Sequence, residues 1–205
     1  MPIEPPDDDG PSVAFPLERL PDGELADLCR AGVETAFAAL YDRHRRFVHS
    51  YALRLLGSPG AAADVHRRAF EAYFEELAGG GSPPPPSIDL YRRTRALALE
   101  SIRNARRARG LPPDETEVRI PDLPPGADAS RRVRILIEGV PPAYREVFYL
   151  RLIENRPDAE TAEIAGVPEA VVRARLAGGL DLLRQAVRRS PAADPADGRK
   201  AVRTP

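Results

Sequence analysis

The chain has 205 residues, of which 42% are hydrophobic and 23 are proline, and its formal net charge is −1. This length suits one or two small domains with packed cores, and the prolines predict several segments without regular structure. The single cysteine, Cys29, excludes an internal disulfide and favours a reducing compartment. The sequence has no long apolar run of the kind that forms a signal peptide or membrane span, so we expect a cytoplasmic protein.

Charge is distributed in alternating blocks along the chain. Residues 1–21 have five acids against one arginine, and residues 87–110 have seven arginines against two acids. Residues 111–130 have five acids against one arginine, and residues 131–190 have eleven arginines against eight acids. Basic helical blocks therefore alternate with acidic, proline-rich ones, a pattern that the near-neutral net charge conceals.

The composition and periodicity predict an all-α fold of two small helical domains joined by an extended, proline-rich acidic linker. The C-terminal domain is predicted to be a helix-turn-helix. We expect a disordered acidic leader at 1–21, a first domain at 22–110, the linker at 111–129, a second domain at 130–189 and a disordered tail at 190–205.

In the first domain, residues 24–28 predict a short helix and residues 34–56 a long one, with apolar residues recurring every three or four positions. The tripeptide Gly57-Ser58-Pro59 supplies a helix stop, an N-cap and a proline suited to a first helical position. A further helix is predicted to about Ala78. Ser87 is predicted to cap the next one, which ends near Arg109.

In the second domain, Ser130 is predicted to cap a helical segment containing Val133, Leu136 and Ile137, and Pro141-Pro142 opens a helix that runs through Ile153. Residues 158–189 then show a short amphipathic segment, a break at Gly166-Val167-Pro168 and a second segment with apolar residues at helical spacing. This pattern is typical of a helix-turn-helix, in which polar residues near the start of the second helix face the major groove of DNA.

On that second helix, Arg173 and Arg175 are placed to meet DNA. A helical hairpin that only packs against the rest of the chain remains the alternative for this stretch. An enzyme is not expected, and neither a metal nor a cofactor is predicted. The three histidines, His44, His49 and His66, lack the spacing of a metal pair on one helix, and the glycines at 79–81 precede prolines where a phosphate-binding loop would need a lysine.

Residues 139–176 resemble the C-terminal domain of sigma-70-type sigma factors of the extracytoplasmic-function group. The matching motifs are Glu160-Thr161-Ala162, Gly166-Val167-Pro168 and Val172-Arg173-Ala174-Arg175-Leu176, without a gap. The first domain is similar to the same family at residues 36–44, at Ala63-Asp64-Val65 with Phe70, and at Leu90-Tyr91-Arg92 with Arg103.

The resemblance implies a dissociable subunit of bacterial RNA polymerase that confers promoter recognition. Its expected partners are the RNA polymerase core and promoter DNA, with an anti-sigma factor as a further partner to consider. The resemblance assigns polymerase binding to Asp64, Arg67, Arg68 and Phe70; promoter melting to Tyr91, Arg92, Arg95, Arg103, Arg106 and Arg107; and recognition of the upstream element to Glu169, Arg173 and Arg175.

The chain also departs from the family pattern. The departures are Arg67-Arg68 where a Gln-acid pair is usual, Asp89 for Trp, Arg93 for an apolar residue, Ala96 for Asn, and Gly178-Gly179 for polar and basic residues. Whether promoter opening survives them is open at this point. Two alternatives therefore stand beside a sigma factor: a sigma-like regulator that acts through contacts with polymerase or an anti-sigma factor, and a plain helix-turn-helix regulator that binds double-stranded DNA tightly by itself.

Overall fold

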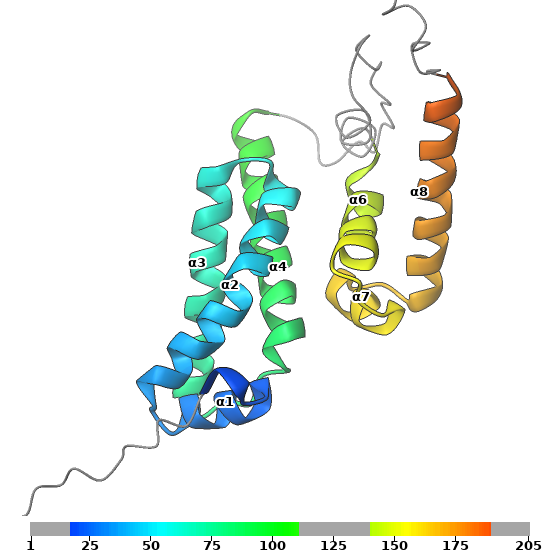
Figure 1. Ribbon diagram of the computed structural model, residues 1–205. Coiled ribbons are helices and arrows are strands. Elements are labelled where there is room, and N and C mark those ends of the chain that lie inside the picture. Colours follow the sequence, from blue (N-terminus) through cyan, green and yellow to red (C-terminus); the bar gives the residue numbers. More distant parts are fainter. Residues whose placement is uncertain (1–16, 111–139, 190–205) are drawn as a thin grey trace, which may run out of the picture.

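The computed structural model describes residues 17–110 and 140–189, and all regular structure within these two ranges is helical (Figure 1). The elements are a short 3-10 turn η1 (Leu17–Arg19), the helices α1 (Asp22–Arg30), α2 (Glu34–Leu56), α3 (Pro59–Ala78), α4 (Pro86–Ala108) and α6 (Pro142–Phe148), a π-helical turn η2 (Tyr149–Ile153), and the helices α7 (Asp158–Ala165) and α8 (Glu169–Arg189). The predicted all-α fold class is confirmed.

The N-terminal body consists of α1 to α4, with α2, α3 and α4 packed along one another (Figure 1). Gly57 ends α2 in the left-handed conformation, with a φ of 65°, which glycine adopts without the penalty of a Cβ atom. The Ser58 hydroxyl then accepts a hydrogen bond from the Ala61 amide, and Pro59 begins α3. The predicted stop, cap and start at these three residues are confirmed.

The prediction that Ser87 caps the following helix is wrong. Helix α4 begins at Pro86, and Pro85 occupies the cap position. Proline has a backbone φ already suited to the first helical position, so the helix begins one residue before Ser87. Ser87 instead lies in the first turn, where its carbonyl oxygen accepts a hydrogen bond from Arg156.

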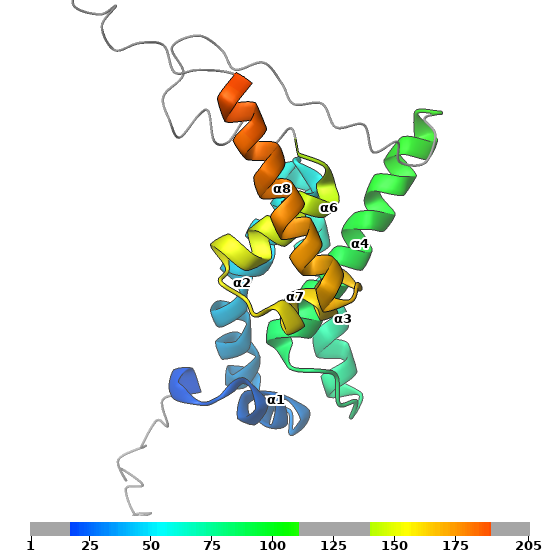
Figure 2. The same ribbon diagram turned by 90° about the vertical axis from the view of Figure 1, so that its right-hand side faces the viewer.

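The C-terminal body consists of α6, η2, α7 and α8, and α8 lies against both α6 and α7 (Figure 2). The helix predicted from Pro141-Pro142 through Ile153 is present, but it widens into the π turn at Tyr149. The predicted cap at Ser130 and the helical segment after it lie outside the described residues, as do the linker, the tail and residues 1–16 of the leader. The boundaries of the two domains therefore stay predictions. Residues 17–21 of the predicted disordered leader are described: Leu17–Arg19 form η1, and Leu17 and Leu20 pack against the core of the N-terminal body. The apolar contacts of these two leucines order the segment, so it is not part of a disordered leader.

The two bodies touch each other, through α4 against α7 and α2 against α6. Tyr149, Leu150 and Ile164 of the C-terminal body belong to the same buried cluster as Tyr51 and Tyr91 of the N-terminal body. The two bodies follow each other along the chain in the predicted order. They pack against each other along one shared interface, which we call the seam.

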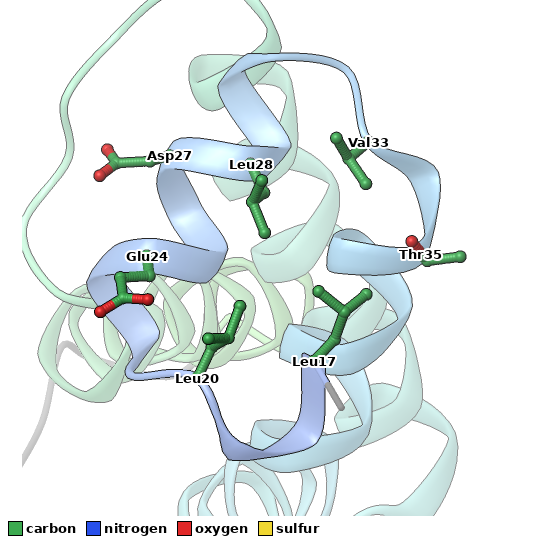
Figure 3. A pocket seen from close by; sticks show the side chains of 7 residues that line it. All are labelled: Leu17, Leu20, Glu24, Asp27, Leu28, Val33 and Thr35. Atoms are coloured by element: carbon green, nitrogen blue, oxygen red, sulfur yellow. The ribbon is translucent and has the colours of Figure 1, made fainter. Parts of the chain in front are cut away.

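An open groove of about 760 Å³ lies at the α1 end of the N-terminal body (Figure 3). It is lined by Leu17, Leu20, Leu28, Val33 and Thr35, with Glu24 and Asp27. The two carboxylates point away from the leucines in Figure 3. Since none of the residues predicted to bind DNA or polymerase lines this groove, we assign it no part in the site described below.

Two titratable groups link the stability of the N-terminal body to pH. Burial alone would raise the pKa of Asp22, but hydrogen bonds from His44 (2.9 Å) and Arg43 (2.6 Å) outweigh it and hold that pKa below its usual 3.8. His66 lies among the rings of Tyr41, Phe70 and His49. Its pKa falls below the usual 6.5, mainly because it is buried and also because His49 is close.

Because the folded state disfavours the protonated His66, its contribution to stability is complete above pH 6.5 and is lost as the pH falls below that value. The contribution of Asp22 persists further and is lost as the pH falls below 3.8. We expect the free energy of unfolding, measured by urea titration, to be lower at pH 5 than at pH 7.5. His66→Gln should reduce that difference, and an undiminished difference in this variant would contradict the assignment to His66.

Candidate nucleic-acid interface

The C-terminal body contains the helix-turn-helix that the sequence predicts. Helix α7 ends at Gly166, whose φ of 62° and ψ of 38° lie in the left-handed region, and α8 starts three residues later. Val172 of α8 is fully buried in a cluster with Val147 of α6 and Ala162 of α7. A small residue at the turn and an apolar contact between the helices hold the second helix at a fixed angle to the first.

The residues predicted to read DNA lie on the first turns of α8. Arg173 is exposed, and its guanidinium lies 3.2 Å from the Glu169 carboxylate and 3.4 Å from the Asp158 carboxylate. Arg175 is half-buried on the same helix. An exposed arginine between two exposed or partly exposed acids is held only weakly, because water and salt screen such pairs. Arg173 can therefore exchange these partners for DNA, and its role in binding DNA stays a prediction.

The residues predicted to melt the promoter divide into two groups along α4. Arg103, Arg106 and Arg107 lie near its C-terminal end, where Arg103 and Arg107 are exposed. Tyr91, Arg92 and Arg95 lie nearer its N-terminal end and all contact the C-terminal body. Tyr91 is completely buried, so in this structure its ring is not available to stack on a base.

The predicted polymerase-binding residues lie on α3. Arg67 is exposed and pairs with Asp64 and Glu71 at 2.9 and 2.7 Å, and Arg68 lies 3.7 Å from Asp64. Phe70 is 4% exposed and packs beneath the surface, with its ring centroid 4.9 Å from that of Tyr41. The surface that α3 presents here is therefore one of mixed charge, with Phe70 supporting it from the core.

Two of the departures from the family pattern contact each other. Arg93 pairs with Asp89 one turn earlier on α4 and with Glu76 of α3, and it also donates to the Ala72 carbonyl at 3.3 Å. Its guanidinium lies 5.8 Å from the centroid of the Tyr73 ring. Asp89 and Arg93 thus form one ion-pair network that joins α3 to α4, and each substitution provides the partner that the other needs.

The glycine pair of α8 has a packing role. A Cβ atom on Gly179 would lie 2.5 Å from Cζ of Phe148 and 3.2 Å from Cδ1 of Tyr144, whereas one on Gly178 would lie 3.4 Å from Tyr144 Cε1. Gly179 therefore allows α8 to approach the aromatic rings of α6. The pair stands where the family pattern has polar and basic residues, and the structure shows a packing requirement for the second glycine.

Sequence reasoning missed the acidic and basic residues of the C-terminal body that face α4. These are Glu146, Glu154, Arg156 and Glu163. The available signal was the position of Glu146, which falls on the same helical face as Val147 and Leu150 and is 6% exposed. A charged residue on an apolar face indicates a buried partner, but the sequence does not say which one.

No group of three or more histidine, cysteine, aspartate or glutamate side chains that could hold a metal ion occurs in residues 17–110 or 140–189. Within the same ranges no helix has the length and apolar character needed to cross a membrane. Cys29 is 1% exposed, and burial raises the pKa of its thiol to about 11. A protonated, buried thiol is a packing residue and a poor nucleophile.

Fold and site together define an all-helical protein with a C-terminal DNA-binding helix-turn-helix. Residues 130–183 match the family described as Sigma-70, region 4. The ECF RNA polymerase sigma factor SigW of Bacillus subtilis (strain 168) is 25% identical over 180 residues, which cover 78% of this chain and 92% of SigW. These matches support the predicted resemblance of the chain to extracytoplasmic-function sigma factors of the sigma-70 family.

Two solved structures share its fold. CnrH in complex with the cytosolic domain of CnrY matches with a TM-score of 0.60 and 21% identity, over 83% of this chain and 99% of that chain. The sigma factor RpoE in complex with the anti-sigma factor NepR, from Bartonella quintana, matches with a TM-score of 0.56 and 12% identity, over 72% and 94%. At these identities the similarities show a common helical fold.

Proposed function

We propose that the protein is a promoter-specificity subunit of bacterial RNA polymerase, which binds the core enzyme and directs it to a set of promoters. The observation that carries this proposal is the helix-turn-helix of α7 and α8. The region 4 match covers α7 and α8 as far as residue 183, and it includes the exposed Arg173 near the start of α8. The N-terminal body would bind the polymerase clamp and the downstream promoter element. The C-terminal body would read the upstream element.

An anti-sigma factor is a natural further partner. The sigma factor RpoE was solved in complex with the anti-sigma factor NepR, and CnrH was solved in complex with the cytosolic domain of CnrY. A protein that covers both bodies at once would hold the chain away from polymerase. This partner would be identified by co-purification from cells in which the chain is inactive.

The proposed function is tested by reconstituting the full chain with core polymerase of the same organism and measuring transcripts from promoters mapped on genomic DNA. We expect initiation at a defined start site that depends on the added chain. A complex with core that initiates at no promoter would favour the second function, a sigma-like regulator that competes for polymerase. The acidic Asp89 at the position of the family's Trp, and the buried Tyr91, are the observations that favour this second function.

Arg173→Ala is expected to weaken promoter binding by the reconstituted enzyme by about tenfold, because an arginine that pairs with one base edge contributes roughly 1 to 3 kcal/mol. Arg184→Ala is the matched control. Arg184 lies on the same helix, is comparably exposed and pairs with one acid of that helix, Asp181, as Arg173 pairs with Glu169. Binding is measured by fluorescence anisotropy on a promoter fragment. Equal affinities for the two variants would remove Arg173 from the recognition surface.

A further inference from the structure

The groove at the α1 end of the N-terminal body, which we call the α1 groove, has an aliphatic floor (Figure 3). Leu17 and Leu20 come from η1 and the residue after it, Leu28 from α1, and Val33 from the residue before α2. Each of these side chains packs against the core on one side and stays partly exposed on the other. The open space of about 760 Å³ above them has room for the side chains on one face of a helix.

Polar contacts hold the walls of the α1 groove in place. Arg43 of α2 donates to the Asp22 carboxylate at 2.6 Å and to the Glu18 carbonyl at 2.7 Å, so it joins both α1 and η1 to α2. His44 lies 2.9 Å from the same carboxylate. The Val33 amide donates to the Leu28 carbonyl at 3.0 Å, which fixes the turn into α2. A surface that is already ordered loses little conformational entropy when a partner binds.

The rim of the α1 groove is acidic. Glu24 and Asp27 lie on it, with their carboxylates directed away from the leucines (Figure 3). Asp27 pairs with Arg30, whereas Glu24 forms no ion pair with any residue in 17–110 or 140–189. Residues 17–35 together contain five acids and two arginines. This excess of negative charge attracts a basic partner and repels the phosphates of nucleic acid.

Charge distinguishes three occupants of the α1 groove. Residues 1–16 of this chain contain four acids and no lysine or arginine, so they would bring like charge to the rim. A second copy docked groove to groove would do the same, because a two-fold interface places identical surfaces together. A helix with aliphatic residues at i, i+3 or i+4 and i+7, flanked by lysine and arginine, matches both the floor and the rim.

We propose that the α1 groove is the docking site for a basic amphipathic helix of a second protein. None of the residues predicted to bind polymerase or DNA lines it, because those residues lie on α3, α4 and α8. The helix and polymerase can therefore be bound at the same time, and the chain would bring its partner to the promoter. This last step rests on the proposed function, whereas binding in the α1 groove does not.

The docking is tested on the full chain with a fluorescein-labelled helical peptide that has leucine at the i, i+3, i+4 and i+7 positions and lysine or arginine beside them. A second peptide keeps the leucines and replaces every basic residue by glutamate. We expect the basic peptide to bind about tenfold more tightly, measured by fluorescence anisotropy, because the rim discriminates by charge. Equal affinities, or no binding of either peptide, would overturn the proposal.

Substitutions locate the bound peptide. Leu28→Ala removes part of the floor and should weaken binding by about tenfold, and Glu24→Lys reverses the rim charge and should weaken it by about threefold. Glu100→Lys is the matched control, because Glu100 is an exposed acid of α4 outside the α1 groove. Circular dichroism establishes that each variant is folded, and the exposed Glu24 keeps the test available if Leu28→Ala is not. Equal affinities for Glu24→Lys and Glu100→Lys would overturn the proposal.

The other occupants give different results. Binding of the basic peptide only after Phe15→Asp, two residues before Leu17, would mean that the chain's own N-terminal segment covers the α1 groove. A dimer in sedimentation that Leu28→Ala dissociates would assign the α1 groove to a second copy, and either result would overturn the proposal. Core polymerase is then added to the peptide complex, and we expect both to stay bound. Release of the peptide by core would contradict simultaneous binding. A chain that binds the peptide and no core would support the docking site and contradict the proposed function.

Discussion

Arg93→Ala is expected to lower the free energy of unfolding by about 2 kcal/mol, because it leaves the Asp89 carboxylate nearly buried and without its cation. The side chain of Asp89 is 9% exposed, and that of Arg93 is 23% exposed where it also meets Glu76 and the Tyr73 ring. The loss therefore combines an unpaired charge with a lost bridge between α3 and α4. Urea unfolding followed by circular dichroism measures it.

The ion-pair network supplies its own control. Asp89→Ala and the double variant complete a double-mutant cycle. We expect the double variant to lose less free energy of unfolding than the sum of the two single losses, because either single substitution already breaks the ion pair. Arg67→Ala is matched in chemistry, since Arg67 also lies between two acids of its own helix, but it is 59% exposed. Its unfolding midpoint should stay close to that of the parent chain. Equal losses of unfolding free energy for Arg93→Ala and Arg67→Ala would contradict the argument that burial of the Asp89–Arg93 pair determines its contribution to stability.

Gly179→Ala is expected to destabilise the C-terminal body while Gly178→Ala stabilises it. A methyl group at residue 179 would lie 2.5 Å from Cζ of Phe148, a ring that is itself 3% exposed and has little room to move. Overpacking of this kind costs roughly 1 to 3 kcal/mol, which exceeds the gain of about 1 kcal/mol from replacing a helical glycine by alanine. At residue 178 the nearest atom is 3.4 Å away, so the helical gain should prevail.

The two glycine variants are compared by thermal unfolding of the full chain. The expected result is a midpoint that rises for Gly178→Ala and falls for Gly179→Ala. A higher midpoint for both variants would mean that α8 can move away from Phe148 at little cost. The close approach of α6 and α8 would then contribute nothing measurable to stability. A double variant whose shift in midpoint equals the sum of the two single shifts would show that the sites act independently.

Helices α2 and α3 could be predicted almost to the residue because their limits depend on local signals. Gly57, Ser58 and Pro59 each act through the conformation of their own backbone or through a hydrogen bond three residues away. The turn at Gly166 is of the same kind. Ser87 shows the limit of this reasoning, because a serine near a helix start is a cap only when no better-placed proline precedes it.

The seam could not be predicted, because its contacts join residues that are far apart in sequence. Tyr51 and Glu146 are 95 positions apart, and Tyr91 and Glu154 are 63 apart. Sequence periodicity identifies which face of a helix is buried but not which helix covers it. The resemblance assigns Tyr91 and Arg95 to promoter melting, and only the structure shows the carboxylates that these two residues contact.

The same limit applies to the departures from the family pattern. Asp89, Arg93 and Gly179 stand where the family pattern has a Trp, an apolar residue and a polar or basic residue. In the structure Asp89 and Arg93 satisfy each other, and Gly179 accommodates Phe148. Two departures from the family pattern that contact each other, such as Asp89 and Arg93, can compensate for each other. The sequence alone does not show that they are in contact.

Purification of the tagged full chain from its own cells tests directly whether the chain acts on promoters as a subunit of RNA polymerase. The core polymerase subunits are quantified, and the DNA that accompanies them is sequenced. We expect an approximately equimolar complex with core, and bound DNA that lies upstream of transcription start sites and shares a sequence motif. A chain that recovers no core subunits, and that binds double-stranded DNA tightly by itself, would contradict it.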